Sequence, residues 1–428
     1  MRSRPSPLLL CRRTLRLIAH GSHTLVRLLL IAAVSPAGRR GERLAAEAAR
    51  LPERLGGAFL KAGQLLATRV DLVGERMAGA LGRLHDGVEP MTAAQALQAA
   101  RPAFGELPPG FRQALTRPPV ASGSIACVYR TDLDGEQVAV KVRRPDVARV
   151  FETDVMMLRL MARAAERVPV FRRVPMTEIA AQMGDCLIGQ LDFAQEAESL
   201  RHLRSVLAEV PGITVPEVRT AACADGIVTM EFVEGLDRSV IGRLPAEARE
   251  AGVATLVRAV YHMLFVEGFI HVDLHQGNVY FREDGGVVIL DAGFVFRLSD
   301  MARTSFTKFF AGMIQGDGES CAGILLSTVR NAEENADVTR FRRDVAELVV
   351  RNAGARARDF DLAAFSVRLF DLQRRHRLFA EPEFVFPLLC LLSLEGTVRR
   401  FHPEMDFQME AAPYVMQGLL VNSAESPG

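Results

Sequence analysis

Apolar residues with a two-residue period mark the first strands that the chain predicts. In residues 137–142 a valine stands at every second position, and residues 127–131 form a second run rich in strand-forming residues. The Asp134-Gly135 pair between the two runs is typical of a tight hairpin turn. Residues 120–142 therefore predict a strand, a hairpin and a second long strand.

A second pair of short apolar runs lies further along the chain. Val279–Phe281 and residues 287–290 read as two buried strands, and residues 283–286, Glu-Asp-Gly-Gly, form the turn between them. Apart from this hairpin, the chain after Gly235 is predicted to be mostly helical.

Helical spacing appears in longer segments. Within residues 146–168 four apolar residues fall on one helical face: Val150, Met157, Leu158 and Met161. Residues 387–394 are almost entirely apolar, but charged residues follow at once, well short of the ~20 apolar residues that a bilayer span needs. We expect this stretch to be a buried core helix.

The N-terminal segment is basic and apolar at once. Eight arginines and no acid precede Glu42, interleaved with leucine-rich runs. The pattern predicts basic amphipathic helices suited to an anionic membrane surface through residues 1–40; the alternatives are a helix that packs on the protein body, or a transit peptide. The longest apolar run, residues 28–34, is too short to span a bilayer. We expect no transmembrane helix and a cytoplasmic protein, or one held peripherally on the inner face of a membrane.

Composition limits the class of protein. With 428 residues, of which 49% are apolar and 24% charged, the chain can bury the cores of two or three domain-sized units. A net charge of +1 argues against a nucleic-acid partner. The six cysteines are scattered without a C-x-x-C pair, which indicates reduced thiols inside a cell.

Candidate chemistry begins with Lys141 in the second predicted strand. The segment Val138-Ala139-Val140-Lys141 is similar to the V-A-I-K strand of kinases, in which the lysine contacts ATP phosphates. An ammonium group on an apolar strand needs an anionic partner. Glu196, 55 residues later, is the candidate for that ion pair.

The second predicted hairpin is flanked by acids and an amide at kinase-like offsets. Asp273 and Asn278 have the separation found in the H-R-D-x-x-x-x-N pattern, and Asp291, 18 residues after Asp273, begins an Asp-Ala-Gly triplet at the D-F-G position. The set predicts an acceptor-side base and two magnesium ligands. A metal site through His271 and His275 is the alternative, although no third ligand is spaced nearby.

One upstream motif goes beyond ordinary kinases. Lys61-Ala62-Gly63-Gln64 looks like the K-x-G-Q signature, and with it the chain resembles the UbiB (AarF/ADCK) family of atypical kinases over about residues 50 to 410. Further segments that carry the resemblance are residues 84–90, 119–126, 230–235 and 394–400.

The resemblance implies an α+β fold: a bilobal protein-kinase-like fold with an N-terminal helical (KxGQ) extension over the cleft. It implies a magnesium- and ATP-dependent ATPase or small-molecule kinase, and several family members support synthesis of isoprenoid quinones such as ubiquinone. The expected ligands are therefore ATP, Mg²⁺ and a lipid or quinone precursor.

Residue roles follow from the same resemblance. Lys61 and Gln64 are expected to point into the active site, and Glu196 to orient Lys141. Asp273 is expected to be the base-like residue, with Asn278 and Asp291 on magnesium. The residues expected to bind the nucleotide are Ala121, Ser122, Gly123 and Ser124 of the loop, Lys141, and Glu231 and Val233 of the interlobe hinge.

The chain also departs from the family pattern at four positions. Gln190 replaces the first acid of an E-x-D motif, which removes one expected charge partner of Lys61. Ala292 replaces the D-F-G phenylalanine, and Cys127 replaces a common glutamine. Gly123 stands where alanine is usual, and glycine permits positive φ and closer approach of backbone amides to phosphates.

These motifs divide the chain into four predicted parts. They are a basic helical segment at 1–48, the KxGQ extension at 49–115, a kinase-like N-lobe at 116–234 and a mostly helical C-lobe at 235–428. Two other functions remain open: a pseudokinase-type module that binds nucleotide to regulate a biosynthetic complex, and an aminoglycoside or choline kinase-like phosphotransferase. The second of these lacks a K-x-G-Q extension.

Overall fold

The computed structural model describes residues 7–68, 73–84, 88–104, 106–108, 110–167, 176–272, 274, 277–329, 337–354, 359, 361–376, 378 and 385–425. The chain divides into two compact units. The first contains Met1–Glu198 and Glu217–Phe232, and the second contains Ser199–Pro216 and Val233–Gly428.

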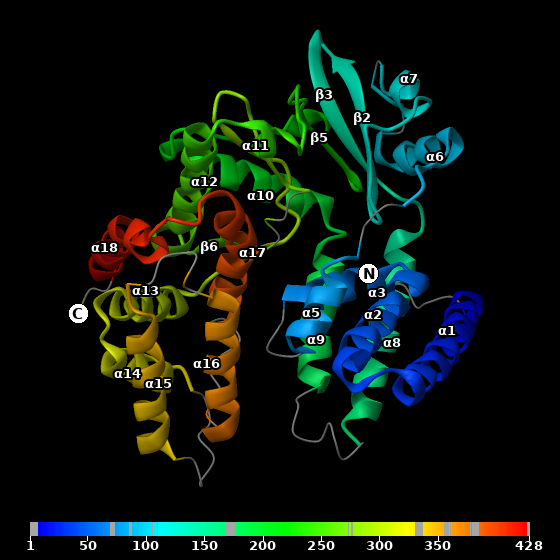
Figure 1. Cartoon of the computed structure of the whole chain (residues 1–428). Coiled ribbons are helices and arrows are strands. Elements are labelled where there is room, and N and C mark those ends of the chain that lie inside the picture. The colour runs from blue at the N-terminus through cyan, green and yellow to red at the C-terminus, as the bar shows by residue number, and fades with distance from the viewer. Residues whose placement is uncertain are drawn as a thin grey trace. The chain divides into compact units, whose positions relative to one another are not determined.

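The first unit combines many helices with one antiparallel sheet (Figure 1). Its helices are α1 (Pro7–Val34), α2 (Ala37–Leu55), α3 (Ala58–Thr68), α5 (Glu75–Leu81), α6 (Ala93–Phe104), α7 (Phe111–Leu115), α8 (Val147–Ala165), α9 (Met176–Gly189) and the start of α10 (Phe193–Val206), with a 3-10 turn η2 (Thr220–Ala222). Its strands are β1 (Ala121–Ser122), β2 (Ala126–Leu133), β3 (Glu136–Arg143) and β5 (Ile227–Glu231), in the order β1-β2-β3-β5.

The predicted first hairpin is confirmed. β2 and β3 pair antiparallel, and Asp134 and Gly135 turn the chain with φ of 54° and 87°. Two consecutive positive φ angles suit the right-handed twist of the flanking strands, which explains the Asp-Gly pair. Val138 and Val140 are fully buried in a core shared with Phe111 of α7, and Figure 1 shows α6 and α7 beside these strands. The alternation in sequence therefore marks the face that these helices cover.

Helix α8 forms within the predicted range, and of the four apolar residues expected on its buried face Met157 is buried and Leu158 packs on apolar clusters. Phe151 and Val155 are buried against Ala62 of α3 and Leu187 of α9. Met161, expected on the buried face, is 38% exposed. The next residue, Ala162, is 5% exposed, so the packed side of α8 continues past this turn but does not include Met161.

Helix α1 packs one face on the body of the protein. Leu10 and Leu17 contact a cluster formed by Leu55, Phe59 and Met157. The opposite face is apolar but exposed, and its large side chains recur with a seven-residue repeat: Leu8, Leu15, Ile18, Leu25 and Leu29. One face of α1 therefore packs on the body of the protein, which was one of the predicted alternatives. The other face is exposed.

The short apolar runs of the N-terminal segment predicted no membrane span, but α1 as a whole helix has the length and hydropathy of one. Within the described part of the chain, α1 alone is long and apolar enough to cross a bilayer, judged by length and composition. Its few arginines interrupt the apolar runs without lowering the overall hydropathy of the helix below that of a span. Core helices of soluble proteins and N-terminal signal sequences share these properties, so α1 by itself is weak evidence for a span.

An ion pair fastens α1 to the rest of the first unit. The buried guanidinium of Arg13 donates to both carboxylate oxygens of Asp154 on α8, at 2.7 and 2.5 Å, and to the carbonyl of Leu55 at 3.0 Å. The backbone amide of Ala58 also donates to Asp154, at 3.1 Å. Burial raises the pKa of Asp154, and the guanidinium and the amide oppose that rise. Gly57, with φ of 59°, leaves room for this carboxylate because a Cβ there would lie 2.6 Å from Oδ2.

The second unit is mostly helical, as predicted for the chain after Gly235. Its helices are α11 (Val240–Arg243), α12 (Ala246–Tyr261), the π-helical turn η3 (His262–Val266), α13 (Asp300–Gln315), α14 (Gly318–Ser327), α15 (Val338–Asn352), α16 (Leu362–His376), α17 (Val385–Phe401) and α18 (Phe407–Glu425), with a 3-10 turn η1 (Leu207–Glu209). Its strands are β4 (Ile213–Thr214), β6 (Phe269–His271), β7 (Val279–Phe281), β8 (Val287–Ile289) and β9 (Val295–Arg297).

Two small sheets carry the predicted metal-binding segment of this unit. β7 and β8 form the predicted second hairpin, and β4 joins β8 in parallel. β6 pairs antiparallel with β9. The apolar stretch near residue 390 is confirmed as part of a buried helix, because Leu388, Leu391 and Leu394 of α17 are at most 2% exposed.

All six cysteines are free, as their spacing predicted. Burial raises the pKa of the Cys186 thiol to about 11 and those of Cys321 and Cys390 to about 12. These three thiols stay protonated at neutral pH and are therefore poor nucleophiles.

Candidate functional site

The predicted ion pair between Lys141 and Glu196 is present in the first unit. The Lys141 ammonium lies 2.5 Å from a carboxylate oxygen of Glu196. The side chain of Glu196 is 2% exposed and that of Lys141 is 16% exposed. The ring of Phe193, one turn before Glu196 on α10, lies 5.3 Å from the ammonium. The ammonium is therefore fixed by its contacts with α10, while part of the lysine side chain stays accessible to solvent.

Strand order explains why Lys141 is so well placed. β3 is an inner strand, with Lys141 opposite Val128 of β2 and Val228 of β5. Because side chains alternate along a strand, Lys141 leaves the sheet on the face opposite to buried Val140 and Val142. α10 supplies its carboxylate partner on that face.

The nucleotide loop connects β1 to β2 beside this lysine strand. Of the four residues expected to bind nucleotide here, Ala121 and Ser122 form β1 and Gly123 and Ser124 follow it. The amide of Gly123 donates to the Ala126 carbonyl at 2.9 Å. The hydroxyl of Ser124 is buried, and among the described residues it has no hydrogen-bond partner. Since buried polar groups are normally satisfied, this hydroxyl is a candidate contact for a ligand.

Gly123 does not use the freedom that glycine offers. Its φ lies outside the positive range, and an added Cβ would meet only the Ala126 carbonyl at an ordinary 3.7 Å. The expectation that glycine gives this loop a special conformation is therefore wrong. An alanine, usual in the family, would fit the same backbone.

The predicted hinge lies where the chain passes from one unit to the other. Glu231 ends β5, its amide bonds to the Glu217 carbonyl at 2.8 Å, and the next amide, of Phe232, bonds to the Gln137 carbonyl at 3.0 Å. Val233 is the first residue of the next segment of the second unit. The role of Glu231 and Val233 in adenine binding stays a prediction.

The K-x-G-Q motif lies on α3. Lys61 and Gln64 are half-buried, and the Gln64 amide donates to the Leu84 carbonyl at 3.4 Å. Between them, Gly63 allows α3 to approach its neighbours, because a Cβ there would lie 2.8 Å from Leu84 and 3.0 Å from Pro52 of α2. The glycine of the motif therefore serves helix packing. That Lys61 and Gln64 reach a nucleotide stays a prediction.

Asn278 and Asp291 flank the same end of the β7–β8 hairpin. Val279 pairs with Ile289. Just beyond this pair, the Leu290 amide donates to the Asn278 carbonyl at 2.9 Å. The register therefore brings the predicted amide and carboxylate ligands to one edge, although 13 residues separate them in sequence. Oxygen ligands of this kind suit Mg²⁺. Asp273, the expected base, lies outside the described residues.

Hydrogen bonds to the backbone shape the turn around Asp291, where Ala292 stands in place of the D-F-G phenylalanine. One carboxylate oxygen of Asp291 accepts the Gly293 amide at 2.8 Å, and its carbonyl lies 2.6 Å from Nε2 of fully buried His271. Ala292 is buried at this turn. One ring nitrogen of His271 is therefore engaged by the backbone. The proposed partner of His271 in the alternative metal site, His275, lies outside the described residues, so that alternative stays a prediction.

Gln190 lies at the end of α9, just before the helix that carries Glu196. The Leu191 carbonyl accepts a bond from Arg143 at 2.7 Å, and the carboxylate of Asp192 accepts the Gln195 amide at 3.0 Å. Asp192 therefore caps the start of α10. Within the described residues no three His, Cys, Asp or Glu side chains gather into a metal site.

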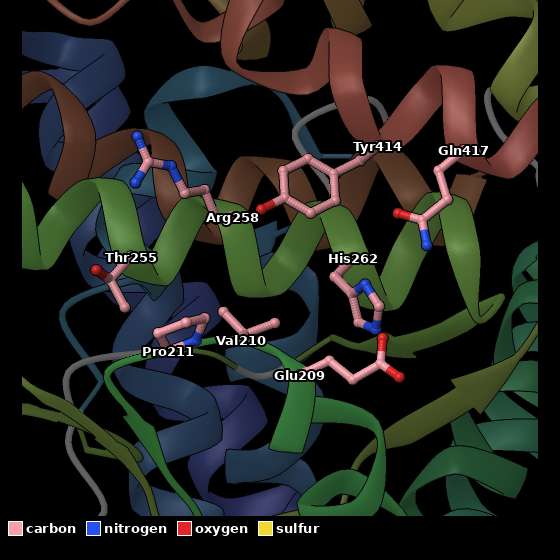
Figure 2. A pocket seen from close by; sticks show the side chains of 8 residues that line it. All are labelled: Glu209, Val210, Pro211, Thr255, Arg258, His262, Tyr414 and Gln417. Carbon is pink, nitrogen blue, oxygen red and sulfur yellow. The ribbon is translucent and has the colours of Figure 1, made fainter.

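A cavity of about 250 Å³ in the second unit has no counterpart in the sequence motifs (Figure 2). In Figure 2 the Glu209 carboxylate points toward the His262 ring. The Arg258 guanidinium donates to the Glu410 carboxylate at 3.1 Å. The lining comes from three distant segments: Glu209, Val210 and Pro211; Thr255, Arg258 and His262; and Tyr414 and Gln417. Only the fold assembles them, so no sequence signal could have marked this cavity.

Comparison with known proteins identifies the class of this fold. The family model of the ABC1 atypical kinase-like domain matches residues 83–325, more than half of the chain. A solved structure described as "The complex structure of Rv3197-erythromycin from Mycobacterium tuberculosis" covers 82% of this chain and 93% of its own, with 19% identity and a TM-score of 0.50. That likeness shows the fold, an α+β kinase-like fold with an N-terminal helical extension, as the sequence predicted. The chain therefore belongs to the ABC1 atypical kinase-like family, the UbiB (AarF/ADCK) group that the K-x-G-Q motif indicated.

Proposed function

We propose that the chain is a magnesium- and ATP-dependent atypical kinase or ATPase that supports synthesis of an isoprenoid quinone such as ubiquinone, or of another lipid, at a membrane surface. The observation that carries the nucleotide part is the Lys141–Glu196 ion pair beside a loop whose buried Ser124 hydroxyl has no hydrogen-bond partner among the described residues. Family membership and the hairpin register of Asn278 and Asp291 add support.

Each residue then has a defined task. Lys141 would hold the non-transferred phosphates, and Glu196 would keep its ammonium in place. Asn278 and Asp291 would supply oxygens to Mg²⁺, which, when bound, neutralises charge on the phosphates. Asp273 would accept the proton of the attacking group, and Lys61 and Gln64 would reach the site from the extension.

The adenine end is expected at the hinge. Backbone groups of Glu231 and Val233 would hold the base, while Ser124 would contact phosphates and Ser122 would hold the loop in place. In this arrangement the strands and α10 orient the groups before nucleotide arrives, which reduces the ordering cost of binding.

Phosphate release from ATP by the purified full chain tests the proposal. We expect release that requires Mg²⁺ and that increases when a phenolic quinone precursor is supplied. The absence of both phosphate release and nucleotide-dependent thermal stabilisation would contradict the proposal. Stabilisation without release would instead favour the pseudokinase-type binding module.

The exposed stripe of α1 supports the membrane part. Its leucines and isoleucine repeat along the helix, and Arg12 and Arg16 beside them are exposed. Other arginines of the segment are already paired: Arg13 with Asp154, and Arg27 with buried Glu47 at 2.9 Å. Apolar contact, helped by a few arginines, would therefore bind this face to an anionic bilayer.

Replacing two leucines of the stripe should remove vesicle binding without unfolding the chain. Leu15→Glu/Leu29→Glu changes side chains that are 63% and 62% exposed, so the core is untouched. We expect affinity for vesicles of equal parts phosphatidylcholine and phosphatidylglycerol to fall roughly tenfold or more, since each leucine contributes roughly 1.5–3 kcal/mol when buried. Co-sedimentation measures the loss.

Leu420→Glu is the matched control, because Leu420 is 69% exposed on α18. Its vesicle binding should equal that of the wild type. Equal binding by the α1 variant and the wild type would rule out α1 as the membrane-binding face.

A further inference from the structure

The nucleotide loop is tied to the extension by one arginine that no motif marked. Arg144 follows β3, three residues after Lys141. Its Nε donates to the Gly123 carbonyl at 2.8 Å, and its Nη2 donates to the Ser122 hydroxyl at 2.9 Å. The same Nη2 donates to the carbonyl of Glu89 at 2.7 Å. One guanidinium therefore joins the loop to a segment just before α6.

Ser122 makes the same connection from the loop side. Its hydroxyl donates to the Val88 carbonyl at 2.8 Å while it accepts from Arg144. The Arg144 amide also donates to the Ile125 carbonyl at 2.8 Å. Both ends of the loop are thus held by Arg144, and one end is held by residues 88–89 as well.

Packing adds a second link between the loop and the extension. The side chain of Ile125 packs on the apolar cluster that contains Ala58 and Ala62 of α3. Ala62 is the second residue of the K-x-G-Q motif. A loop anchored at Ser122, Gly123 and Ile125 cannot shift without moving α3 or residues 88–89.

We infer that Arg144 and Ser122 are positioning residues that couple nucleotide binding at the loop to the order of the extension segment at residues 88–89. The inference rests on the proposed nucleotide function of this site. Because coupling between two sites is reciprocal, nucleotide should order residues 88–89, and their attachment should strengthen nucleotide binding. A planar guanidinium can serve several acceptors at once, and a lysine ammonium cannot match that fork.

Hydrogen exchange on the full chain tests the coupling. In the wild type, a non-hydrolysable ATP analogue with Mg²⁺ should slow exchange in peptides covering residues 121–126 and also in those covering 88–92. In Arg144→Gln the protection of 121–126 should remain and that of 88–92 should disappear. The dissociation constant of the analogue should rise about five- to tenfold, because the substitution removes a charge-assisted hydrogen bond.

Further variants separate positioning from simple stability. Arg144→Lys keeps the charge but not the fork, so it should behave as Arg144→Gln does. Ser122→Ala should weaken the protection of 88–92 without removing any charge. Arg149→Gln changes an exposed arginine on α8 that pairs locally with Asp146 at 3.4 Å; it is the matched control and should behave as the wild type does.

Each outcome decides between the two claims. Retained protection of 88–92 in Arg144→Gln, or full rescue by lysine, overturns the coupling and leaves the proposed function standing. No nucleotide protection anywhere in the wild type overturns the proposed function and the coupling with it. Equal loss in Arg149→Gln would show a general charge effect and also overturn the coupling.

Discussion

Asp291→Asn is expected to lower magnesium-dependent phosphate release roughly a hundredfold or more, because a metal ion stabilises the transferring phosphate by several kcal/mol and the substitution removes a charged metal ligand. The variant should fold normally. Asparagine keeps an oxygen that can accept the Gly293 amide, so the 2.8 Å bond that shapes this turn can persist. The measurement is phosphate release over a range of Mg²⁺ concentrations, with thermal unfolding as the folding check.

The same hairpin offers a matched control. Asp284, at its exposed tip, accepts the amide of the glycine two residues later at 2.9 Å, just as Asp291 does at the other end. Asp284→Asn therefore makes the same chemical change in the same local geometry, away from the predicted metal edge. Its turnover should equal that of the wild type. Undiminished turnover in Asp291→Asn would show that this carboxylate does not act on the metal.

Asp154→Ala is expected to destabilise the first unit by about 3–5 kcal/mol, the cost of removing one partner from a buried ion pair. The change leaves the buried Arg13 guanidinium without its carboxylate and the Ala58 amide without its acceptor. It also releases the contact that fastens α1 to α8. Urea unfolding followed by circular dichroism measures the loss, and limited proteolysis should then cut within α1.

Two comparisons show whether the loss comes from an uncompensated buried charge. Asp185→Ala breaks an exposed pair with Arg159 at 2.8 Å and should cost less than about 1 kcal/mol. Replacing both partners, as Arg13→Met with Asp154→Leu, should recover most of the stability, since apolar residues of similar volume often replace a buried pair at little cost. A loss in Asp154→Ala no larger than in Asp185→Ala would refute the account.

The two hairpins and the ion pair of Lys141 were predictable from short sequence patterns. The Asp134-Gly135 turn and the alternating valines of β3 specify one hairpin, and the apolar runs of β7 and β8 specify the other. The partner of Lys141 was also predictable. An ammonium on an apolar strand needs an anion, and Glu196 stands at the kinase-like interval.

The errors came from surfaces whose covering partner is distant in sequence. The sequence spacing places Met161 on the helical face of its apolar neighbours, but it is 38% exposed while the next residue, Ala162, is buried. α1 has apolar residues on two faces, so periodicity alone could not choose the face that packs. Gly123 suggested an unusual loop conformation, yet its φ is ordinary because Arg144 and Ala126 hold the backbone.

The sequence by itself determined the family, the two hairpins, the Lys141–Glu196 pair and the candidate metal ligands, because each follows from short motifs or local periodicity. Only the tertiary structure decided which face of α1 packs, that Arg13 meets Asp154 across 141 residues, and that Arg144 joins the loop to residues 88–89. The physical reason is that these contacts join distant side chains, or end on backbone carbonyls. Every residue has such a carbonyl, so no residue type in the sequence marks it as a partner.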